Sequence, residues 1–423
     1  MNDLMEKIVS LAKRRGFIFP GSEIYGGLAN SWDYGPLGVQ LKKNITDEWW
    51  KIFVERRSDM YGIDPAIIMN PKVWEASGHV AEFSDPLVEC KSCHQRFRAD
   101  QLEGACPNCD GTEFSEAKNF NLLFKTFIGP LEDSSTTAYL RGELAQAMFV
   151  DYPQIIQTMR PALPFGIAAQ GKVFRNEITP GNFIFRTREF NLMEFEYFVA
   201  ESDWEKYFEY WREKMHDWLT HLGVTPAHVH EHEIPDGERA HYSKRTIDFE
   251  YDYPFGQKEL YGLAYRTDFD LARHTKATGN DWGALPHVIE PTFGVDRSVL
   301  VTLLEAYHEE EVEGETRVVL RFPKWLAPVH VAVLPLSKKD ELAKPTQEIA
   351  ASLQSHFRVE YDETQSIGKR YRRQDEIGTP YCITVDFETL NDKKVTVRDR
   401  DTMQQERVDI SLLADYLSDK LRS

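Results

Sequence analysis

The chain contains 423 residues, of which 42% are apolar and 28% charged, a composition typical of a folded globular protein with enough core for two or three domains. No run approaches the roughly 18 apolar residues of a membrane span, and the charged stretch 1–16 has no apolar signal-peptide core. We therefore expect a cytoplasmic protein without membrane segments. The net charge of −18 argues against broad non-specific nucleic-acid binding but leaves room for a local basic face.

The N-terminal region alternates between helical patterns and loops. Residues 3–15 carry apolar side chains at helical spacing, which predicts an amphipathic helix. Residues 17–38 are dense in glycine, proline and aromatic residues and predict a loop with tight turns. The helical period returns at 39–57. The residues that follow predict a strand containing Pro71 and then another loop.

Two pairs of cysteines form the strongest short pattern in the chain. Cys90 and Cys93 are separated by two residues, as are Cys106 and Cys109, and twelve residues lie between the pairs. Each pair can close a tight turn that aims two thiolates at one ion, so the spacing predicts a structural zinc ribbon. Four cysteines fill a tetrahedral shell and leave no open position for catalysis. A degenerate ribbon without metal and a redox pair are the alternatives.

Residues 171–199 predict a β-hairpin, with a first strand at 172–177, a turn at 179–182 and a second strand that ends near residue 199. Because side chains alternate across a strand, Arg175 and Glu177 are expected on one face. On the second strand, alternation separates one face with Phe190, Leu192, Glu194 and Glu196 from a more apolar face with Asn191, Met193, Phe195 and Tyr197.

The hairpin carries positive and negative side chains close together. A guanidinium group binds phosphate or carboxylate through two hydrogen bonds and keeps its charge. A surface with both signs suits a ligand with both signs, such as a nucleotide together with an amino acid. The alternative is a surface hairpin with solvated cross-strand ion pairs. The charged residues are Arg175, Arg186, Arg188, Glu177, Glu189 and Glu194.

The segments around the hairpin predict helices and further strands. A helix is expected within 134–170 and a long amphipathic helix at 203–223. Two strands around a Phe-Gly turn are expected at 246–270. A strand, a sharp turn at glycine and a helix are expected at 287–307, with Arg297 at the start of the helix.

Three histidines fall on one face of an expected strand between these segments. They are His228, His230 and His232. Three imidazoles can bind a metal, but the helical HExxH spacing is missing. A polar strand face is therefore the preferred interpretation.

The C-terminal part has a pattern of its own. Residues 308–317 are highly charged and predict an exposed connection. From about residue 328, strands alternate with helices, which predicts a small α/β domain with a largely parallel sheet. Cys382, in an apolar strand, is expected in its core. A local basic cluster suits the binding of phosphate groups, with a solvated helix face as the alternative, and consists of Lys369, Arg370, Arg372 and Arg373.

Several of these stretches, in this order, resemble one known family. RNE at 175–177, FRTREF at 185–190 and MEFE at 193–196 resemble motif 2 of class II aminoacyl-tRNA synthetases, specifically of the homodimeric glycyl type. GVDR at 294–297 resembles motif 3, and the helix, strand and loop at 39–79 resemble motif 1. The segment IGKRYRRQDEIGTPY resembles the anticodon-binding domain that the glycyl, histidyl, prolyl and threonyl enzymes share. This resemblance implies that the basic cluster of Lys369, Arg370, Arg372 and Arg373 binds tRNA phosphates.

The resemblance implies an α+β fold whose catalytic domain is an antiparallel sheet flanked by helices. This domain is expected at 1–325, with a zinc-ribbon insertion at 86–116 and an α/β anticodon-binding domain at 326–423. Motif 2 corresponds to about 171–199 and motif 3 to about 287–307.

The implied function is ligation of glycine to tRNA. Glycine is activated with ATP to glycyl-adenylate and transferred to the 3′ end of tRNA-Gly by a homodimer that uses Mg²⁺ and carries structural zinc. Two alternatives remain open at this stage. One is a non-catalytic, synthetase-like nucleic-acid-binding dimer, and the other is a class II synthetase for a different amino acid.

The family positions also imply roles for individual residues. The catalytic residues are Arg175, which bridges the glycine carboxylate and the α-phosphate, and Arg186 and Arg297, which hold the β- and γ-phosphates. Glu259 is expected to hold Mg²⁺ with ATP. The expected ATP-binding residues are Arg175, Asn176, Glu177, Phe185, Arg186, Thr187, Arg188, Glu189, Phe190, Glu259, Leu260, Gly294, Val295, Asp296 and Arg297.

The implied glycine pocket is lined mainly by carboxylates for the ammonium group. One departure from the family lies here, because the chain reads RGELAQ where the family reads RPETAQ, although Glu143 is kept. The expected glycine-binding residues are Arg98, Glu143, Phe190, Asn191, Leu192, Met193, Glu194, Glu290, Pro291, Thr292, Phe293 and Gly294.

Overall fold

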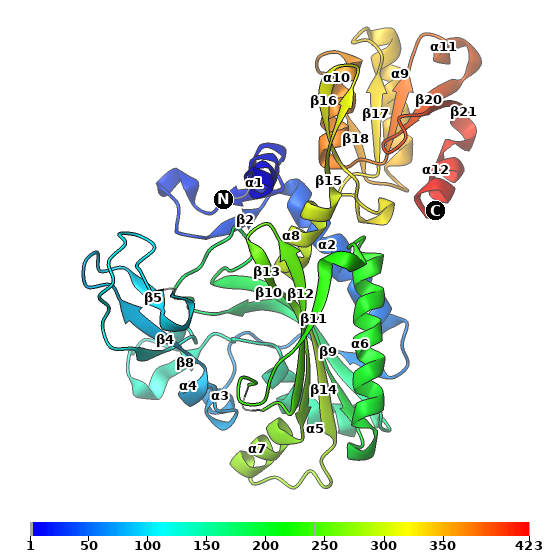
Figure 1. The fold of residues 1–423 in the computed structure, drawn as a ribbon. Coiled ribbons are helices and arrows are strands. Elements are labelled where there is room, and N and C mark those ends of the chain that lie inside the picture. The colour runs from blue at the N-terminus through cyan, green and yellow to red at the C-terminus, as the bar shows by residue number, and fades with distance from the viewer. Residues whose placement is uncertain (1–2, 103, 241, 423) are drawn as a thin grey trace.

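The computed structural model describes residues 3–102, 104–240 and 242–422. A large unit is built on a seven-stranded sheet, and the C-terminal residues form a smaller unit on a five-stranded sheet (Figure 1). None of the helices in these described ranges combines the length and apolarity that crossing a bilayer requires.

The seven-stranded sheet has the order β11-β12-β13-β14-β10-β9-β3. All neighbours pair antiparallel except β3 and β9, which run parallel. This mostly antiparallel arrangement confirms the expected class of the catalytic fold. The strands are β3 Met60–Gly62, β9 Phe165–Phe174, β10 Glu189–Val199, β11 Val229–Glu233, β12 Arg245–Tyr253, β13 Gly256–Thr267 and β14 His287–Gly294.

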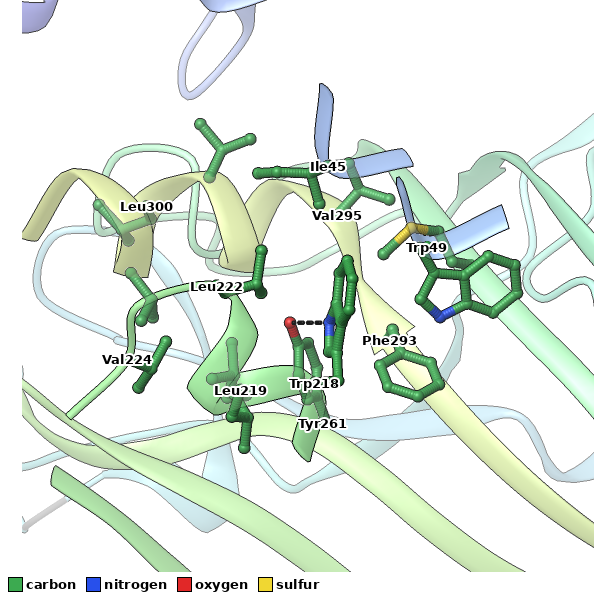
Figure 2. Packing of buried hydrophobic residues seen from close by; sticks show 14 of the residues in the cluster. Ile45, Trp49, Trp218, Leu219, Leu222, Val224, Tyr261, Phe293, Val295 and Leu300 are labelled. Carbon is green, nitrogen blue, oxygen red and sulfur yellow. Dashed lines mark hydrogen bonds between the residues drawn. The ribbon is translucent and has the colours of Figure 1, made fainter. Parts of the chain in front are cut away.

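One face of this sheet packs on an aromatic core below helices α2 Pro36–Trp50, α6 Trp204–His221 and α8 Val295–Ala306. The rings of Trp49 and Phe293 lie 5.7 Å apart between centroids. Trp218 donates a 3.2 Å hydrogen bond from Nε1 to the hydroxyl of Tyr261, which satisfies its buried N–H (Figure 2). This packing holds the strands that carry the site in fixed register.

The other face packs against α5 Ala145–Met159 and α7 Phe269–Thr278. Met148 and Phe149 of α5 meet Phe198 of β10 and Leu271 of α7 in a second apolar cluster. Because both faces are covered, side chains on β10 from Leu192 onward are buried whichever way they point. The charged residues of this part of the strand, Glu194 and Glu196, are therefore buried as well.

The remaining elements of the large unit surround this sheet. Residues 39–57 form most of α2 and a π-helical turn at Lys51–Glu55. The cysteine-rich insertion is a three-stranded sheet of order β5-β4-β6. The other elements are α1 Asp3–Arg15, β1 Ile18–Pro20, β2 Trp32–Tyr34, α3 Pro71–Ala76, α4 His79–Glu82, β4 Ser84–Glu89, β5 Arg96–Arg98, β6 Lys118–Asn121, β7 Lys125–Phe127 and β8 Thr137–Tyr139.

The hairpin at 171–199 differs from the expected one on its first strand. β9 begins earlier and ends at Phe174, so residues 175–188 form an irregular loop rather than a strand and a tight turn. Asn182 and Phe183 have positive φ angles of 55° and 60° in this loop. The shared strand face expected for Arg175 and Glu177 is therefore wrong. The alternation on β10 is confirmed, since Met193, Phe195 and Tyr197 all enter the aromatic core.

Two other expectations differ from the structure, the second only in its secondary structure, since most of residues 308–317 are exposed as expected. Pro71 begins helix α3 rather than lying in a strand, because the Asn70 side chain accepts a 3.0 Å hydrogen bond from the Lys72 N–H and proline suits the first helical turn. Residues 308–317 belong mostly to a hairpin of β15 Tyr307–Val312 and β16 Glu315–Leu320. Its turn residues Glu313 and Gly314 have φ angles of 54° and 82°, as two-residue hairpin turns require.

The C-terminal sheet has the order β18-β17-β19-β20-β21 and is mixed rather than largely parallel. Only β18, β17 and β19 are parallel, because the connections to β20 and β21 are too short for crossover helices. Cys382 is buried here as expected. The elements are β17 Val331–Pro335, α9 Asp340–Leu353, β18 Val359–Tyr361, α10 Ile367–Ile377, β19 Tyr381–Val385, α11 Thr389–Asp392, β20 Lys394–Asp399, β21 Gln405–Asp409 and α12 Leu413–Arg422.

A buried ion cluster joins the two units. Asp375 of α10 accepts from Arg317 of β16 at 2.8 Å and from Arg398 of β20 at 2.9 Å. The side chains of Arg317 and Asp375 have no exposed surface. Arg400 adds a hydrogen bond to the carbonyl of Phe322, which lies between the units. The charged segment after residue 307 therefore contributes to the contact between the units.

Candidate active site

A cleft lies where the loop after β9 meets β10, β13, β14 and the first turn of α8. The loop 175–188 leaves the sheet and returns to it, so its side chains stand over the ends of the strands. The wall of the cleft includes Arg175, Glu177, Arg186, Phe190, Glu259 and Arg297. Other residues expected at ATP lie on the same wall, namely Phe185, Thr187, Leu260, Gly294 and Asp296.

Ion pairs and stacking hold the arginines of this cleft. The Arg186 Nε lies 3.1 Å from a Glu177 carboxylate oxygen, and the Arg297 Nη1 lies 3.1 Å from a Glu259 carboxylate oxygen. The Arg297 guanidinium stacks 4.5 Å above the Phe185 ring. Burial raises the pKa of Glu259, but Arg297 and then Arg175 outweigh it and hold this pKa below its ordinary value. A cleft with three guanidinium groups and the Glu259 carboxylate suits a polyphosphate with a divalent cation.

Beside the cleft lies a buried acidic pocket. The carboxylates of Glu143, Glu194 and Glu290 come from the segment before α5, from β10 and from β14, and each residue is at most 7% exposed. Burial raises the pKa of Glu143, but His79 and Arg266 lower it to well below its ordinary value. Burial and then the neighbouring Glu290 raise the pKa of Glu194 well above its ordinary value.

Sequence reasoning missed the groups that brace this pocket. Arg266 is fully buried and donates to Glu290 at 2.7 Å and to Asp270 at 2.8 Å. Gln146 donates to Glu143 at 3.0 Å and to Asp270 at 2.8 Å. In the sequence, only the four-residue spacing from Arg266 to Asp270 could have indicated one of these contacts. The contact of Arg266 with Glu290 and that of Gln146 with Asp270 join distant segments.

Arg175 stands between the cleft and the acidic pocket. Its Nε donates to the carbonyl of Gly142 at 3.1 Å, and the next residue is Glu143. The Leu144 N–H in turn donates to Glu194 at 3.3 Å. The family departure in RGELAQ therefore leaves Glu143 in the acidic pocket, just before the helix that begins at Ala145.

Several side chains of the predicted site point elsewhere. Met193 and Phe293 belong to the aromatic core, on the opposite face of the sheet from Glu194. Pro291 also points to the core face, because it is two residues from Phe293 on β14 and side chains alternate along a strand. Val295 is fully buried in the core as well. A side-chain role in glycine or ATP binding is therefore wrong for these four residues.

Other predicted residues lie near the cleft but have different contacts. Asp296 accepts from the Tyr34 hydroxyl at 2.5 Å and from the Asn191 N–H at 2.6 Å, so it fixes the first turn of α8 to β10. Both Asp296 and Asn191 face the cleft and an adjoining cavity. Asn176, Arg188 and Glu189 line only that adjoining cavity. Leu192 lies on the cleft wall.

Comparisons with known proteins agree with this geometry. The family model "tRNA synthetase class II core domain (G, H, P, S and T)" matches residues 139–307, and the model "Anticodon binding domain" matches residues 330–420. A protein named glycine–tRNA ligase from Caldanaerobacter subterraneus subsp. tengcongensis is 51% identical, with 99% of this chain and 98% of that protein covered. The chain belongs to the glycine–tRNA ligase family.

Other relatives with the same name agree. The glycine–tRNA ligase of Alkaliphilus oremlandii is 50% identical, with 99% of this chain and 98% of the relative covered. That of Bacillus anthracis is 48% identical, with 99% of each chain covered. The likeness spans nearly the full length of this chain. It therefore includes the cysteine insertion as well as the class II core and the anticodon-binding domain.

The insertion of this glycine–tRNA ligase family member brings its four cysteines together. Their four sulfur atoms all lie within 4.8 Å of one another. The Sγ atoms of Cys90 and Cys109 are 3.7 Å apart, and those of Cys93 and Cys106 are 3.5 Å apart. Zinc–sulfur bonds of about 2.3 Å in a tetrahedron give sulfur separations of about 3.8 Å. The four thiols therefore fit one zinc ion.

The insertion also reaches toward the acidic pocket. Arg98 of β5 lies 2.8 Å from Asp85 and 2.7 Å from Asp100 and is about 15% exposed, so it is not a solvated charge. Together with Glu143 and Arg175 it lines a second cavity next to the cleft. The position of Arg98 is compatible with its expected place near glycine.

The basic cluster of α10 divides into buried and exposed residues. Arg370 is 1% exposed and donates to the carbonyls of Glu363 and Gln365, so the expected tRNA contact is wrong for this residue. Lys369, Arg372 and Arg373 line a surface depression.

His230 and His232 lie on one exposed face of β11, as the sequence favours, whereas His228 ends the 3-10 turn before this strand. Each lies beside a carboxylate, with His228 at Glu305, His230 at Asp252 and His232 at Glu250. Within the described ranges, the groups of residues able to hold a metal include none of the three.

Proposed function

We propose that this protein ligates glycine to tRNA-Gly at the expense of ATP. The observation that carries the proposal is Arg175, which faces the arginine-lined cleft and contacts the backbone beside Glu143 of the acidic pocket. A triphosphate in the cleft and an ammonium group among the carboxylates would place the amino acid's carboxylate next to Arg175. The full-length relatives carry the name glycine–tRNA ligase.

In the first step, the glycine carboxylate attacks the α-phosphorus of ATP and pyrophosphate leaves. Arg175 faces the position where negative charge develops, and Arg186 and Arg297 hold the leaving phosphates. Positioning and charge stabilisation suffice for phosphoryl chemistry of this kind, and no protein nucleophile is required. Mg²⁺ held by Glu259 and phosphate oxygens would neutralise part of the triphosphate charge.

The acidic pocket accounts for recognition of the ammonium group. Glu143, Glu194 and Glu290 supply acceptors on three sides, and Thr292 adds a hydroxyl on the same face as Glu194. In the second step, a hydroxyl of the terminal tRNA adenosine attacks the acyl carbon of glycyl-adenylate, the bond from this carbon to the phosphate oxygen breaks, and AMP leaves. The anticodon-binding domain supports tRNA as the acceptor.

The proposed active form is a homodimer. Exposed apolar side chains gather around the region that resembles motif 1, where Ile68 forms a β-bridge to Leu140 beside β8. Phe127 and Ile128 of the neighbouring β7 segment are 38% and 53% exposed. Apolar patches of this kind mark interfaces. Light scattering after size exclusion should give twice the chain mass.

The overall proposal is tested by aminoacylation. Purified protein, ATP, Mg²⁺ and radiolabelled glycine should produce acid-precipitable tRNA whose label is released by mild base. The same reaction with labelled proline or threonine should produce none. The tRNA sample must be one that another glycine–tRNA ligase can charge. If this protein forms no glycyl-tRNA from that sample, the proposal is contradicted.

Zinc content gives a separate prediction. Metal analysis of the purified protein should find one zinc ion per chain, and Cys106→Ser should lose it because three thiolates leave the tetrahedral shell incomplete. Cys382→Ala is the matched control, since Cys382 lies in the C-terminal core, and should keep the ion. A wild-type protein without zinc, or a Cys106→Ser protein with a full complement, would refute the ribbon assignment.

Binding of tRNA gives another prediction. The double variant Lys369→Ala with Arg372→Ala should raise the KM for tRNA-Gly on the order of tenfold, because two phosphate contacts are lost, and should flatten its salt dependence. Glycine-dependent ATP–pyrophosphate exchange should stay at the wild-type rate. Lys344→Ala on α9 serves as the control. An unchanged KM would show that tRNA binds away from this face.

A further inference from the structure

Glu196 is a buried carboxylate to which the proposed mechanism gives no role. It lies on β10 and has no exposed surface. Neither of its carboxylate oxygens has a hydrogen-bond partner in the described part of the chain. Native structures rarely leave a buried carboxylate without a partner, so this residue requires an explanation.

Glu196 faces the acidic pocket. By alternation on β10 it shares the face of Glu194, and the pairing of β10 with β14 places it opposite Glu290. One carboxylate oxygen from each of the three residues lies within 4.8 Å of the other two. We call Glu194, Glu196 and Glu290 the carboxylate trio.

Positive charge near the trio is scarce. Arg266 of β13 is the nearest cation, and it is already shared between Glu290 and Asp270 of α7. β9 presents the apolar Ile167 directly opposite Glu196. A second buried cation, Arg141, interacts with Glu194 through its charge but donates its hydrogen bonds to the carbonyls of Lys172 and Pro65. The other titratable groups around the pocket are Glu143 before α5, Tyr242 in the segment before β12, His79, which contacts Glu143, and His274, which contacts Gln146.

Three buried carboxylates this close together cannot all ionise when the guanidinium group in contact with them is shared with Asp270 and Arg141 makes its hydrogen bonds elsewhere. Each charge loses hydration, and each repels its neighbours, so such a cluster holds protons at neutral pH. Burial and then Glu290 raise the pKa of Glu196 well above its ordinary value, in agreement with this geometry. Such protons belong to the cluster rather than to one residue.

We propose that Glu196 completes a proton-holding trio behind the ammonium site, and that binding of glycine releases a proton from this trio to solvent. The inference rests on the proposed function. The entering ammonium group brings one positive charge, and one carboxyl group becomes a carboxylate as its proton leaves. Glu196 acts through Glu194 and Glu290, so it is a positioning residue rather than a catalytic one.

One consequence is that affinity for glycine depends on pH. When one proton leaves on binding, the Kd falls about tenfold for each pH unit gained while the free trio is still protonated. The Kd levels off once the free trio has lost that proton. The negative charge that pairs with the ammonium group of glycine therefore forms only when glycine binds. The free protein avoids a buried cluster of unpaired carboxylates.

The test is calorimetric titration of glycine into the full-length protein at pH 7 in phosphate, HEPES and Tris, whose ionisation enthalpies differ. The dependence of the observed heat on buffer gives the number of protons released, and we expect about one per site. Glu196→Gln keeps the shape but cannot ionise, so its neighbours ionise more readily and release should fall to half or less. Glu213→Gln, on the exposed side of α6, should match wild type.

Each outcome is decisive. Glycine binding without proton release in wild type, or equal release from Glu196→Gln, overturns the inference; the second result would assign the proton to His79 or another group. If Glu196→Gln does not fold, wild-type titrations between pH 6 and 8 decide, because Kd must fall with pH in step with the protons counted. Absence of any glycine binding would instead contradict the proposed function.

Discussion

Replacing Arg175 by alanine should reduce glycine-dependent ATP–pyrophosphate exchange by at least about 10²–10³-fold, the usual effect of removing one group that stabilises developing charge. Arg175 is the cation that faces both the polyphosphate cleft and the segment of Glu143. Its loss removes the charge that would bridge the amino acid and the α-phosphate. Exchange is measured as incorporation of labelled pyrophosphate into ATP.

The matched control for this variant is Arg212→Ala. Arg212 lies on α6, pairs with Glu209 and Glu231, and is 38% exposed. It should keep exchange near the wild-type rate. Both proteins should keep the wild-type mass in light scattering. Near-normal exchange in Arg175→Ala would remove Arg175 from the reaction.

Replacing Asp375 by alanine should cost about 3–5 kcal/mol of stability, because it leaves two buried guanidinium groups without their shared carboxylate. Arg317 and Arg398 both donate to Asp375, and these three side chains are at most 5% exposed. Since Arg317 belongs to β16 and Asp375 to α10, the contact between the two units should weaken first. Thermal and urea unfolding followed by tryptophan fluorescence measure the loss.

The control for the buried cluster is a surface ion pair of the same domain. Asp392 pairs with Arg407 at 2.7 Å, and both side chains are 29–40% exposed. Asp392→Ala should unfold close to the wild-type midpoint, because water screens exposed charges. If Asp375→Ala is no less stable than Asp392→Ala, the cluster does not hold the units together.

The sequence predicted the structure well where local periodicity decides it. The pleat of a strand fixes alternation, so the two faces of β10 follow from the order of its residues, with Met193 inward and Glu194 toward the pocket. The cysteine spacing likewise predicted a converging cluster. Pro71 was a missed local signal, because an asparagine directly before a proline marks the start of a helix.

Other features depended on contacts between distant segments. The loop 175–188 has no period, so its path could not be inferred, although its charges indicated a ligand. Arg266 and Glu290 are adjacent only because β13 and β14 pair. Arg370 and Lys369 are neighbours in sequence, yet only tertiary packing decides that one is buried and the other lies at the surface. Composition could not distinguish them.

We propose that the arginine cleft and the acidic pocket together activate glycine. ATP–pyrophosphate exchange by the wild-type protein, measured with each of the twenty amino acids in turn, tests this assignment. We expect exchange with glycine and near-background exchange with the other nineteen. Exchange with a different amino acid, or with none, would rule out glycine activation at this site.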